Sequence, residues 1–542
     1  MTDAHIQAAS RIAAAYAVSG AALELGTVVL DGTARPDASV RIPLAMLNRH
    51  GLIAGATGTG KTKTLQVLTE QLSASGVPVV VADVKGDLSG LGTPGVSTDR
   101  IAKRAKDIGD DWQPTGYPVE YLALGGLGIG IPVRATVTAF GPLLMSKILD
   151  LNETQESSLG LIFHYADTAG LPLLDLKDLR ALIQFLTSDD GKSDLAGIGG
   201  LSKATAGVIL RELTTLDNSG GDVFFGEPEW EPGDLLRTSD DGRGVVSAIE
   251  LAAVQDKPEL FSTFLMWLLA DLFHELPEVG DLDKPKLVFF FDEAHLLFNN
   301  ASKAFLTQVT QTVRLIRSKG VGIFFVTQVP ADVPDSVLGQ LGNRVQHALR
   351  AFTPDDATNL AKAVRTYPKT VDYDLSSLLT QLGIGEAIVT VLSDTGAPTP
   401  VAWTRLRAPR SLMAQIDPTI QRQAVTNSPL HTKYGTAVDR ESAYEKLAAR
   451  LAPPSPASRD DRHGAATPSS RDERRDSSPT EPAAPRSEQT SGRPAASASE
   501  QHAGAVAGVL ASPAFKSFAR SAATALGREI TRSLFGTAKR RR

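Results

Sequence analysis

Eight residues near the start of the chain combine glycines with a lysine and a threonine at a spacing that binds phosphate. They are Gly55, Ala56, Thr57, Gly58, Thr59, Gly60, Lys61 and Thr62, which match the GxxxxGK[ST] pattern in full. Residues 52–54 predict a strand before this loop and residues 64–72 a helix after it, so backbone N–H groups would face bound phosphate. We expect the loop to bind a nucleoside triphosphate, with Lys61 on the β- and γ-phosphates and Thr62 on Mg²⁺. The alternative is a glycine-rich turn without a ligand.

Two acids end the apolar stretch 287–291. A buried strand there would place Asp292 and Glu293 at the carboxyl edge of a sheet, where α/β proteins bind ligands. We predict that Asp292 holds Mg²⁺ and that Glu293 activates the attacking water as a general base. The alternative is a strand that ends in surface acids.

A third polar group follows the apolar stretch 323–326, where Gln328 could sense the γ-phosphate or cap the next turn. Before this stretch, Arg314 and Arg317 end a predicted helix. They are either a solvated helix end or an arginine finger that reaches the nucleotide of a neighbouring subunit. Arg344 is a weaker candidate for the same role.

Three further charges, Asp83, Lys85 and Asp87, follow the predicted strand 77–81. They could contact the nucleotide site, line the pore of a ring, or be ordinary loop charges.

The composition excludes several classes of site. The chain has 542 residues, no cysteine and a formal net charge of −6. Disulfides, cysteine-ligated metals and thiol nucleophiles are therefore excluded, and bulk attraction does not favour nucleic-acid binding. No apolar run reaches the ~18 residues that span a bilayer, and the N-terminus lacks a signal pattern, so we expect a cytoplasmic protein.

Strand and helix patterns alternate through most of the chain and predict an α/β fold with a largely parallel sheet. Further strands are expected at 245–249 and 387–391, and around Val28 and Val40. The predicted parts are a short N-terminal α/β segment at 1–48, an ATPase core at 49–410 with a helical insertion at about 141–234, a helical C-terminal part at 411–451, a linker at 452–505 and a basic helix at 506–542.

The last ninety residues differ in composition from the rest. Residues 452–505 contain no Leu, Ile, Val, Met, Phe, Tyr or Trp, which predicts a disordered linker. Residues 513–542 carry eight Lys or Arg and one Glu, and apolar residues recur there every four positions from Phe518 to Leu534. This pattern predicts a basic amphipathic helix that docks on the body, grips a DNA backbone, or lies on an anionic membrane surface.

His295 makes the acidic motif read D-E-A-H, which is also found in two-lobed helicases. About 120 folded residues are expected after Gln328, without a second motor-like sequence. A single motor core would complete its site between subunits, which predicts a ring.

Several of these strings resemble the bacterial HerA-like ATPases of the HerA/FtsK superfamily. They are residues 49–62, 82–90, 152–156, 283–297, 314–328 and 342–350. The resemblance implies a RecA-like P-loop motor, usually hexameric, that hydrolyses ATP with Mg²⁺ to move along double-stranded DNA. It assigns Lys61, Thr62, Asp292, Glu293 and Gln328 the roles above, and matches Arg317 to the trans-acting arginine of the family.

One departure from HerA proteins lies at the N-terminus. HerA proteins carry an N-terminal β-barrel, whereas 48 residues precede the matched strings here. This puts docking of a nuclease partner in question. The runner-up hypothesis is an ATP-driven scaffold or switch that controls assembly of a protein or membrane complex without moving along DNA.

Overall fold

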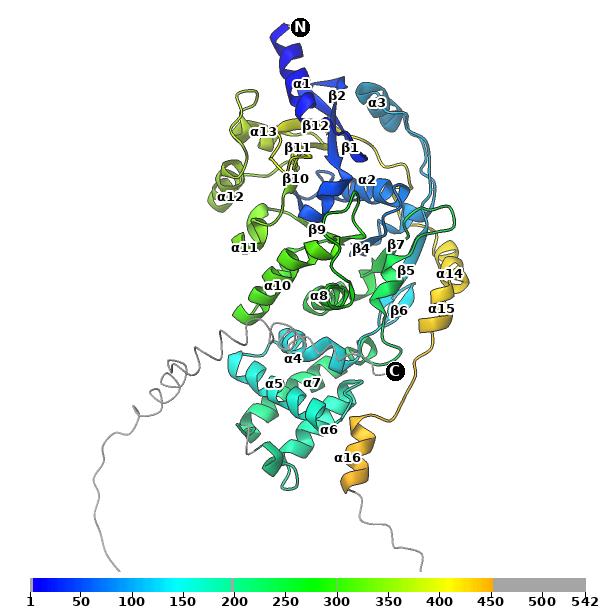
Figure 1. Ribbon diagram of the computed structural model, residues 1–542, viewed down its shortest axis with the longest axis vertical. Helices are drawn as coiled ribbons and strands as arrows, with labels where there is room; N and C mark the ends of the chain where they lie inside the picture. Colours follow the sequence, from blue (N-terminus) through cyan, green and yellow to red (C-terminus); the bar gives the residue numbers. More distant parts are fainter. Residues whose placement is uncertain (1–2, 196–198, 300, 452–542) are drawn as a thin grey trace, which may run out of the picture. The chain divides into compact units, whose positions relative to one another are not determined.

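The computed structural model describes residues 3–195, 199–299 and 301–451, whose arrangement is shown in Figure 1. The described residues up to Leu447 belong to one compact unit, and residues 448–451 belong to a second. The predicted linker at 452–505 and basic helix at 506–542 lie outside the described residues.

The first unit is built on a twelve-stranded sheet of order β2-β1-β12-β11-β10-β3-β9-β8-β4-β7-β5-β6. Neighbouring strands run parallel from β10 to β6 and antiparallel from β2 to β10. The predicted α/β class with a largely parallel sheet is confirmed. The strands are β1 Ala22–Leu30, β2 Thr33–Pro43, β3 Gly51–Ala54, β4 Val79–Asp83, β5 Val119–Leu124, β6 Ile131–Val133, β7 Val246–Glu250, β8 Leu287–Phe291, β9 Val321–Thr327, β10 Asn343–Gln346, β11 Glu386–Thr390 and β12 Ala402–Leu406.

Helices connect most of the parallel strands, as parallel pairing requires. Several begin at a residue whose side chain accepts a hydrogen bond from the first turn, such as Thr98, Thr136 and Asn152. The α-helices are α1 Asp3–Ala15, α2 Lys61–Ala74, α3 Asp99–Ile108, α4 Val137–Ile148, α5 Glu153–Thr168, α6 Leu176–Thr187, α7 Lys203–Asn218, α8 Pro258–Glu275, α9 His295–Phe298, α10 Lys303–Leu315, α11 Asp335–Leu338, α12 Pro354–Arg365, α13 Leu375–Gln381, α14 Pro418–Asn427, α15 Pro429–Tyr434 and α16 Ala443–Leu451.

The strands predicted from apolar runs are confirmed, with ends that shift by up to two residues. The short strand β10 was not predicted because it contains a single apolar residue, Val345. Three of its four residues are buried. The buried Asn343 side chain donates to the carbonyls of Met46 and His50, each at 3.0 Å. This long-range pairing satisfies a polar group that would otherwise be costly to bury.

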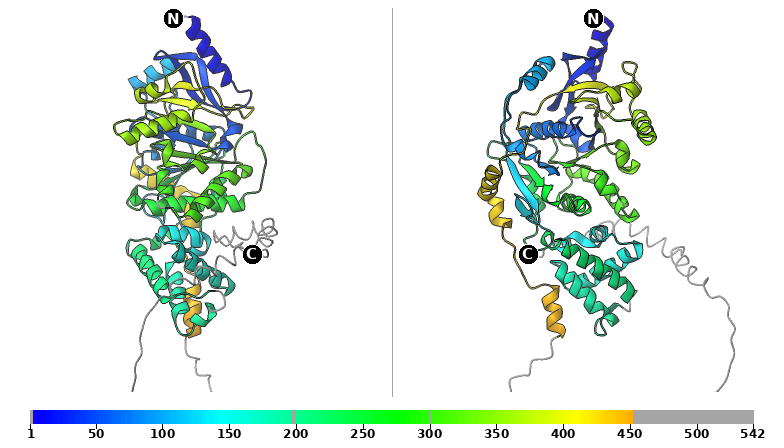
Figure 2. Two further views of the ribbon diagram at one scale, coloured as in Figure 1. Left: turned by 90° about the vertical axis from the view of Figure 1, so that its left-hand side faces the viewer. Right: turned by 180° about the vertical axis from the view of Figure 1, so that it is seen from behind.

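The predicted helical insertion is confirmed as α4 to α7, which lie between β6 and β7 in the chain. Figures 1 and 2 show α5, α6 and α7 as one packed group, apart from the sheet. The first of these helices begins at Val137, not near Gly141. Gly141 has φ 79° and precedes Pro142, and these two residues form a kink within α4.

The centre of the sheet is packed with aromatic rings. All five residues of β8 are buried. The rings of Phe290 and Phe324 lie 5.2 Å apart, and those of Phe291 and Phe325 lie 5.4 Å apart. These contacts hold β8 and β9 side by side and fix where each strand ends.

After β12 the chain forms hydrogen bonds with β1 and then with the segment after β4. The amide of Arg407 donates to Leu25 O at 2.8 Å, and that of Leu412 donates to Thr93 O at 2.9 Å. Further on, Gln421 of α14 donates to Ile129 O at 3.0 Å, and the Tyr444 amide donates to Asp178 of α6 at 2.8 Å. The C-terminal part of the unit therefore contacts both the sheet and the helical insertion.

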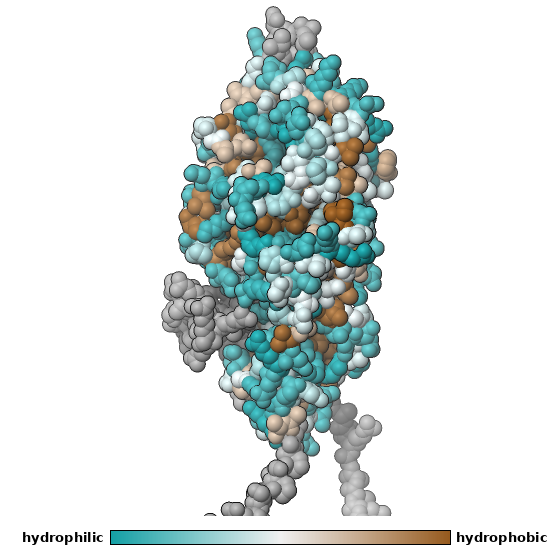
Figure 3. All heavy atoms as spheres, turned by 90° about the vertical axis from the view of Figure 1, so that its right-hand side faces the viewer, coloured by the Kyte–Doolittle hydropathy of each residue, from teal (hydrophilic) through white to brown (hydrophobic). Residues whose placement is uncertain are grey.

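None of the described helices is both long enough and apolar enough to cross a membrane. On the face drawn in Figure 3, hydrophobic residues form separate small groups among hydrophilic ones.

Buried His50 predicts how stability depends on pH. His50 is 2% exposed, its Nδ1 accepts from the Ile323 amide at 3.0 Å, and burial lowers its pKa to about 4. In the unfolded chain the pKa returns to an ordinary 6.5. The neutral ring therefore stabilises the fold fully above pH 6.5, and this contribution is lost as pH falls towards 4. We expect roughly 2 kcal/mol of this loss by pH 5.

His50→Asn should remove this pH dependence. The amide oxygen of asparagine can accept from the Ile323 amide in place of the ring nitrogen. Chemical denaturation at pH 7 and pH 5 should show a smaller fall in unfolding free energy than in the parent chain. Exposed His164 is the matched control, and His164→Asn should fall as the parent does. An unchanged fall in His50→Asn would contradict the assignment.

Candidate functional site

The site is assembled where neighbouring parallel strands end. β3 pairs with β9 so that Ala54 lies opposite Thr327, and β9 pairs with β8 so that Phe325 lies opposite Phe291. The phosphate loop, Gln328 and the acidic pair follow these three strands directly. Parallel pairing therefore brings the three predicted groups to the same edge of the sheet.

The phosphate loop has the conformation that its glycines permit. Gly55, Gly58 and Gly60 have φ of 154°, 79° and 116°, and α2 begins at Lys61. The N-cap Gly60 has no side chain to bond the first N–H groups of α2, which leaves them directed at the loop opening. Lys61 Nζ donates to Gly55 O at 2.6 Å and to Ala56 O at 3.2 Å. The lysine therefore lies across the loop, where a phosphate would meet it.

Three other segments hold the loop in place. The Gly55 amide contacts Thr327 O and Gln328 O at 3.2 and 3.1 Å. The Ala56 amide donates to Ala348 O at 2.8 Å, and the Gly385 amide donates to Thr59 O at 3.1 Å. The loop is thus supported by β9 on one side and by the segments after β10 and before β11 on the other.

His347 is a site residue that the sequence reasoning missed. Its Nε2 lies 2.9 Å from Thr64 Oγ1 in the first turn of α2. A Cβ added at Gly55 would lie 2.5 Å from the His347 Cβ, so the loop glycine and the histidine pack directly together. Burial and the Lys61 charge lower the pKa of His347 to about 4, and the neutral ring serves as a hydrogen-bond partner. Nothing in its spacing marks this histidine, although it lies within the string 342–350.

The acidic pair holds two carboxylates close together directly after β8. Burial and neighbouring Glu293 raise the pKa of Asp292 to about 7. Asp292 Oδ1 accepts from the Glu293 amide at 2.9 Å. A divalent cation would stabilise the ionised carboxylate, so the site fits Mg²⁺ held by Asp292 and by the Thr62 hydroxyl.

Glu293 has a strained backbone. Its φ of 49° is left-handed, which is uncommon for a residue with a Cβ. Its Oε2 lies 3.4 Å from His295 Nδ1. Burial lowers the pKa of Lys61, and the carboxylates of Glu293 and Asp292 act in the opposite direction. Strain of this kind persists where the surrounding structure holds a residue in a functional geometry.

The neighbouring strand β4 contributes Asp83 and Lys85. Val81 of β4 lies opposite Phe290 of β8, so Asp83 ends its strand beside Asp292. Burial and Asp87 raise the pKa of Asp83 to about 6, and its Oδ2 accepts from the Leu88 amide at 3.0 Å. Asp83 therefore shapes the loop that carries Lys85.

The predicted arginines lie away from the phosphate loop of their own chain. Arg314 is exposed at the end of α10, and Arg317 is half-buried just before β9 begins. β9 has seven residues, so its two ends are about 20 Å apart, and the phosphate loop lies at the far end. Arg344 lies near the amino end of β10 and donates to Leu341 O and Leu338 O at 3.4 Å. Exposed Gln328 is at the edge that carries the acidic pair.

Comparison with known proteins gives one family match. Residues 29–542 match the family model described as Helicase HerA-like C-terminal. Among curated proteins, the chain is 24% identical over 379 residues to the DNA double-strand break repair helicase HerA of Sulfurisphaera tokodaii, covering 68% of each chain. It is 23% identical over 363 residues to the probable helicase MJECL08 of Methanocaldococcus jannaschii, covering 64% of each chain.

Solved structures with similar folds share less sequence. The bacterial conjugative coupling protein TrwBdeltaN70 is 15% identical, with a TM-score of 0.49, over 75% of this chain and 94% of that one. VirB4 of Thermoanaerobacter pseudethanolicus is 14% identical, with a TM-score of 0.45, over 72% of this chain and 97% of that one.

The contact between Thr64 and His347 predicts a paired substitution result. Thr64→Val keeps the side-chain shape but leaves the buried His347 Nε2 without its partner, which should lower the unfolding free energy by about 1–3 kcal/mol. Nucleotide affinity should fall as well, because the first turn of α2 loses its anchor. Urea denaturation and binding of a fluorescent nucleotide measure the two effects.

Thr69 is the matched control on the same helix. It is fully buried, and its Oγ1 has no hydrogen-bond partner among the residues that the structure describes. Thr69→Val should therefore cost little or nothing. Equal losses in the two variants would show that the hydroxyl of Thr64 has no special role.

Glu293→Gln should abolish nucleotide hydrolysis while nucleotide binding remains. The amide keeps the shape but cannot accept a proton, so turnover should fall at least about 100-fold. Phosphate release and nucleotide affinity are measured on the same preparation. Glu278→Gln, at an exposed residue of the loop before β8, is the control and should hydrolyse as the parent does. Retained turnover in Glu293→Gln would reject Glu293 as the base.

Proposed function

Since the chain belongs to the helicase HerA-like C-terminal family and is a P-loop ATPase with a RecA-like α/β fold, we propose that it is a motor that uses ATP hydrolysis to move along double-stranded DNA. The observation that carries the proposal is the convergence of Lys61, Asp292 and Glu293 at one edge of the parallel sheet. The relatives named as helicases align with about two thirds of this chain, which supports the same class of activity.

The chemistry follows from the positions of the side chains. Residues Gly55 to Thr62 hold the phosphates of ATP, and Lys61 moves from the loop carbonyls to the β- and γ-phosphates. Thr62 and Asp292 would hold Mg²⁺, and the ion would neutralise phosphate charge. Glu293 accepts the proton of the attacking water, and Gln328 responds to the γ-phosphate at the end of β9.

A ring is the proposed working form. Arg314 and Arg317 lie about the length of β9 from the phosphate loop of their own chain. They would act in the site of a neighbouring copy, and an arginine supplied in this way raises hydrolysis by 10³–10⁵-fold where it operates. We propose a homo-oligomer, with six subunits as the resemblance implies.

The runner-up function is an ATP-driven scaffold or switch. The formal net charge of −6 favours it, because a DNA-binding protein more often carries basic surface. The partners considered for the basic tail, a nuclease or a membrane surface, involve residues outside the described ones. Both functions require hydrolysis at Glu293, and they differ in whether DNA changes its rate.

Hydrolysis with and without linear double-stranded DNA distinguishes the two functions. We expect DNA to stimulate turnover several-fold, and high salt to remove the stimulation, since phosphate contacts release counterions. Glu293→Gln is the blank for contaminating ATPases. If the turnover is robust but the same with and without DNA at low salt, the result would contradict the motor and favour the scaffold or switch.

A further inference from the structure

We propose that Lys85 is a further catalytic residue, which contacts the terminal phosphate of ATP bound in its own subunit, and that the segment 407–416 positions it. We call this segment the C-terminal strap. The inference rests on ATP hydrolysis at the site described above and does not depend on movement along DNA.

The backbone places Lys85 at the edge of the sheet that carries the acidic pair. β4 and β8 are parallel neighbours, and Val81 lies opposite Phe290. Asp83, the last residue of β4, and Asp292, the first residue after β8, are each two residues further on, so they lie level with each other. Lys85 follows Asp83 by two residues, on the side of β8 away from β9. The lysine is thus attached to the strand next to the one that carries Asp292 and Glu293.

The Lys85 side chain is available for a ligand. It is exposed, and none of the described residues accepts a hydrogen bond from its ammonium group. Burial chiefly lowers the pKa of Lys61, and the charge of Lys85 lowers it further. The same charge opposes the raised pKa of Asp292. Lys85 therefore acts electrostatically on groups that would bind the β- and γ-phosphates and Mg²⁺.

The loop that carries Lys85 has a defined shape. Its turn is closed by the Leu88 amide, which donates to Asp83 Oδ2 at 3.0 Å, and by the Ser89 hydroxyl, which donates to Gly86 O at 2.6 Å. Gly86 has φ 76°, and a Cβ there would lie 2.8 Å from Gln415 Nε2. The positive φ is a conformation that residues with a Cβ rarely adopt, so a glycine suits this turn beside the strap.

The strap bonds directly to the Lys85 loop. Gln415 Nε2 donates to Lys85 O at 2.9 Å. The Ile416 amide donates to the Ser89 hydroxyl at 3.2 Å. The backbone on both sides of Gly86 is therefore held from outside the sheet.

The same strap is anchored on α2, the helix that begins in the phosphate loop. Glu70 is 2% exposed and accepts from the amides of Arg410 and Ser411 at 2.8 and 2.9 Å. Lys63 Nζ donates to Met413 O at 3.2 Å. One extended segment thus bonds both to the helix that carries Lys61 and to the loop that carries Lys85.

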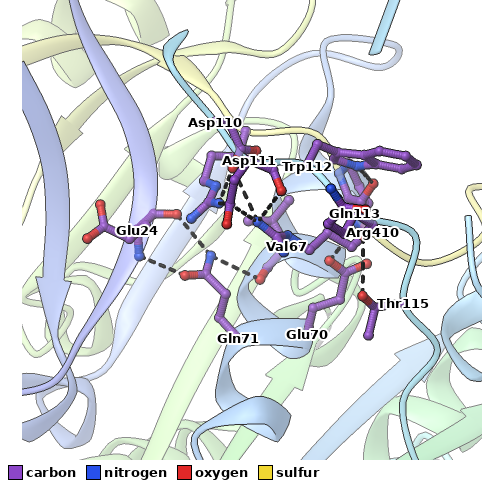
Figure 4. Close-up of polar contacts among 12 residues, drawn as sticks. Glu24, Val67, Glu70, Gln71, Asp110, Asp111, Trp112, Gln113, Thr115 and Arg410 are labelled. Carbon is purple, nitrogen blue, oxygen red and sulfur yellow. Dashed lines mark hydrogen bonds and ion pairs between the residues drawn. The ribbon is translucent and has the colours of Figure 1, made fainter. Parts of the chain in front are cut away.

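Figure 4 shows how the strap is fixed at its anchor. The Arg410 guanidinium pairs with Asp111 at 2.5 Å and with Asp110 at 3.3 Å, while its carbonyl accepts from the Thr115 amide at 2.9 Å. Arg410 is therefore bound on both its main chain and its side chain. This leaves the strap little freedom to slide along α2.

A lysine in this place has a specific use. The terminal phosphate spreads its charge over three oxygens during transfer, and cations on several sides stabilise it. Lys61 approaches from the phosphate loop, and Lys85 would approach from the β4 side. Because Arg314 and Arg317 would act only after assembly, Lys85 would join Lys61 as a second cation that supports hydrolysis within a single chain.

The test measures hydrolysis without DNA and compares nucleotide affinities. Lys85→Met should lower kcat at least about tenfold. Its affinity for a non-hydrolysable ATP analogue should fall about fivefold or more, and its affinity for ADP should stay within about twofold. Lys85→Arg keeps the charge and should recover part of kcat. Lys103→Met, at an exposed lysine of α3, is the control and should behave as the parent.

Several results would overturn the proposal. If Lys85→Met keeps its DNA-free kcat within about twofold of the parent, Lys85 does not assist the reaction; if stimulation by DNA is then lost, the residue contacts DNA. Equal losses of affinity for the ATP analogue and for ADP would exclude a contact specific to the terminal phosphate. Loss of hydrolysis by Glu293→Gln, measured alongside, keeps failure of this proposal distinct from failure of the ATPase site.

The role of the strap is tested by a double-mutant cycle. Gln415→Ala removes the side-chain bond to Lys85 O and should lower kcat about two- to threefold in the parent chain. In the Lys85→Met background the same change should have no further effect. An equal fold-loss in both backgrounds would show that the strap does not act through Lys85.

Discussion

The parallel register of β3, β9, β8 and β4 is the constraint on which the site depends. Each strand is short and buried, and its neighbours fix where it ends. The pairing brings a phosphate loop, a glutamine and an acidic pair to one edge of the sheet, because Ala54 lies opposite Thr327 and Phe291 lies opposite Phe325. A shift of one residue in any of these pairings would reverse the faces of a strand and separate the groups. The aromatic contacts between β8 and β9 oppose such a shift.

Several ionisable side chains lie at this edge of the sheet, where burial makes their charged forms unfavourable. Burial raises the pKa of Asp292 and Asp83 and lowers that of Lys61 and His347. Each shift means that the folded chain disfavours the ionised form of the group, and a bound nucleotide with its cation supplies the opposite charges. The fold therefore places these groups before the ligand binds, and ligand binding would lower the free-energy cost of their ionised forms. Such shifts are common where chemistry takes place.

The C-terminal part of the unit connects the site to the rest of the structure. The strap bonds to α2 and to the Lys85 loop, and the following helices contact β5, β6 and the helical insertion. This path is continuous in the described residues, and each of its contacts is a hydrogen bond or a packed helix. These contacts join the phosphate-loop helix to the helical insertion through segments that no motif contains.

The sequence by itself determined the chemistry of the site. The phosphate loop and the acidic pair are local patterns in which residue type and spacing already define what can bind. The α/β class and the helical insertion were also predictable, because apolar runs and helical periodicity are local. The insertion was expected from about Gly141, and helix α4 begins at Val137 and is kinked at Gly141.

Only the tertiary structure decided which distant residues support that chemistry. Strand β10 has one apolar residue, and its buried Asn343 bonds to carbonyls nearly 300 positions away. His347 meets Thr64, and Gln415 meets Lys85, across similar separations in the chain. A single hydrogen bond between distant residues leaves no periodicity or spacing in the sequence. Such contacts are set by the packing of the whole sheet, and they become visible only when the chain is folded.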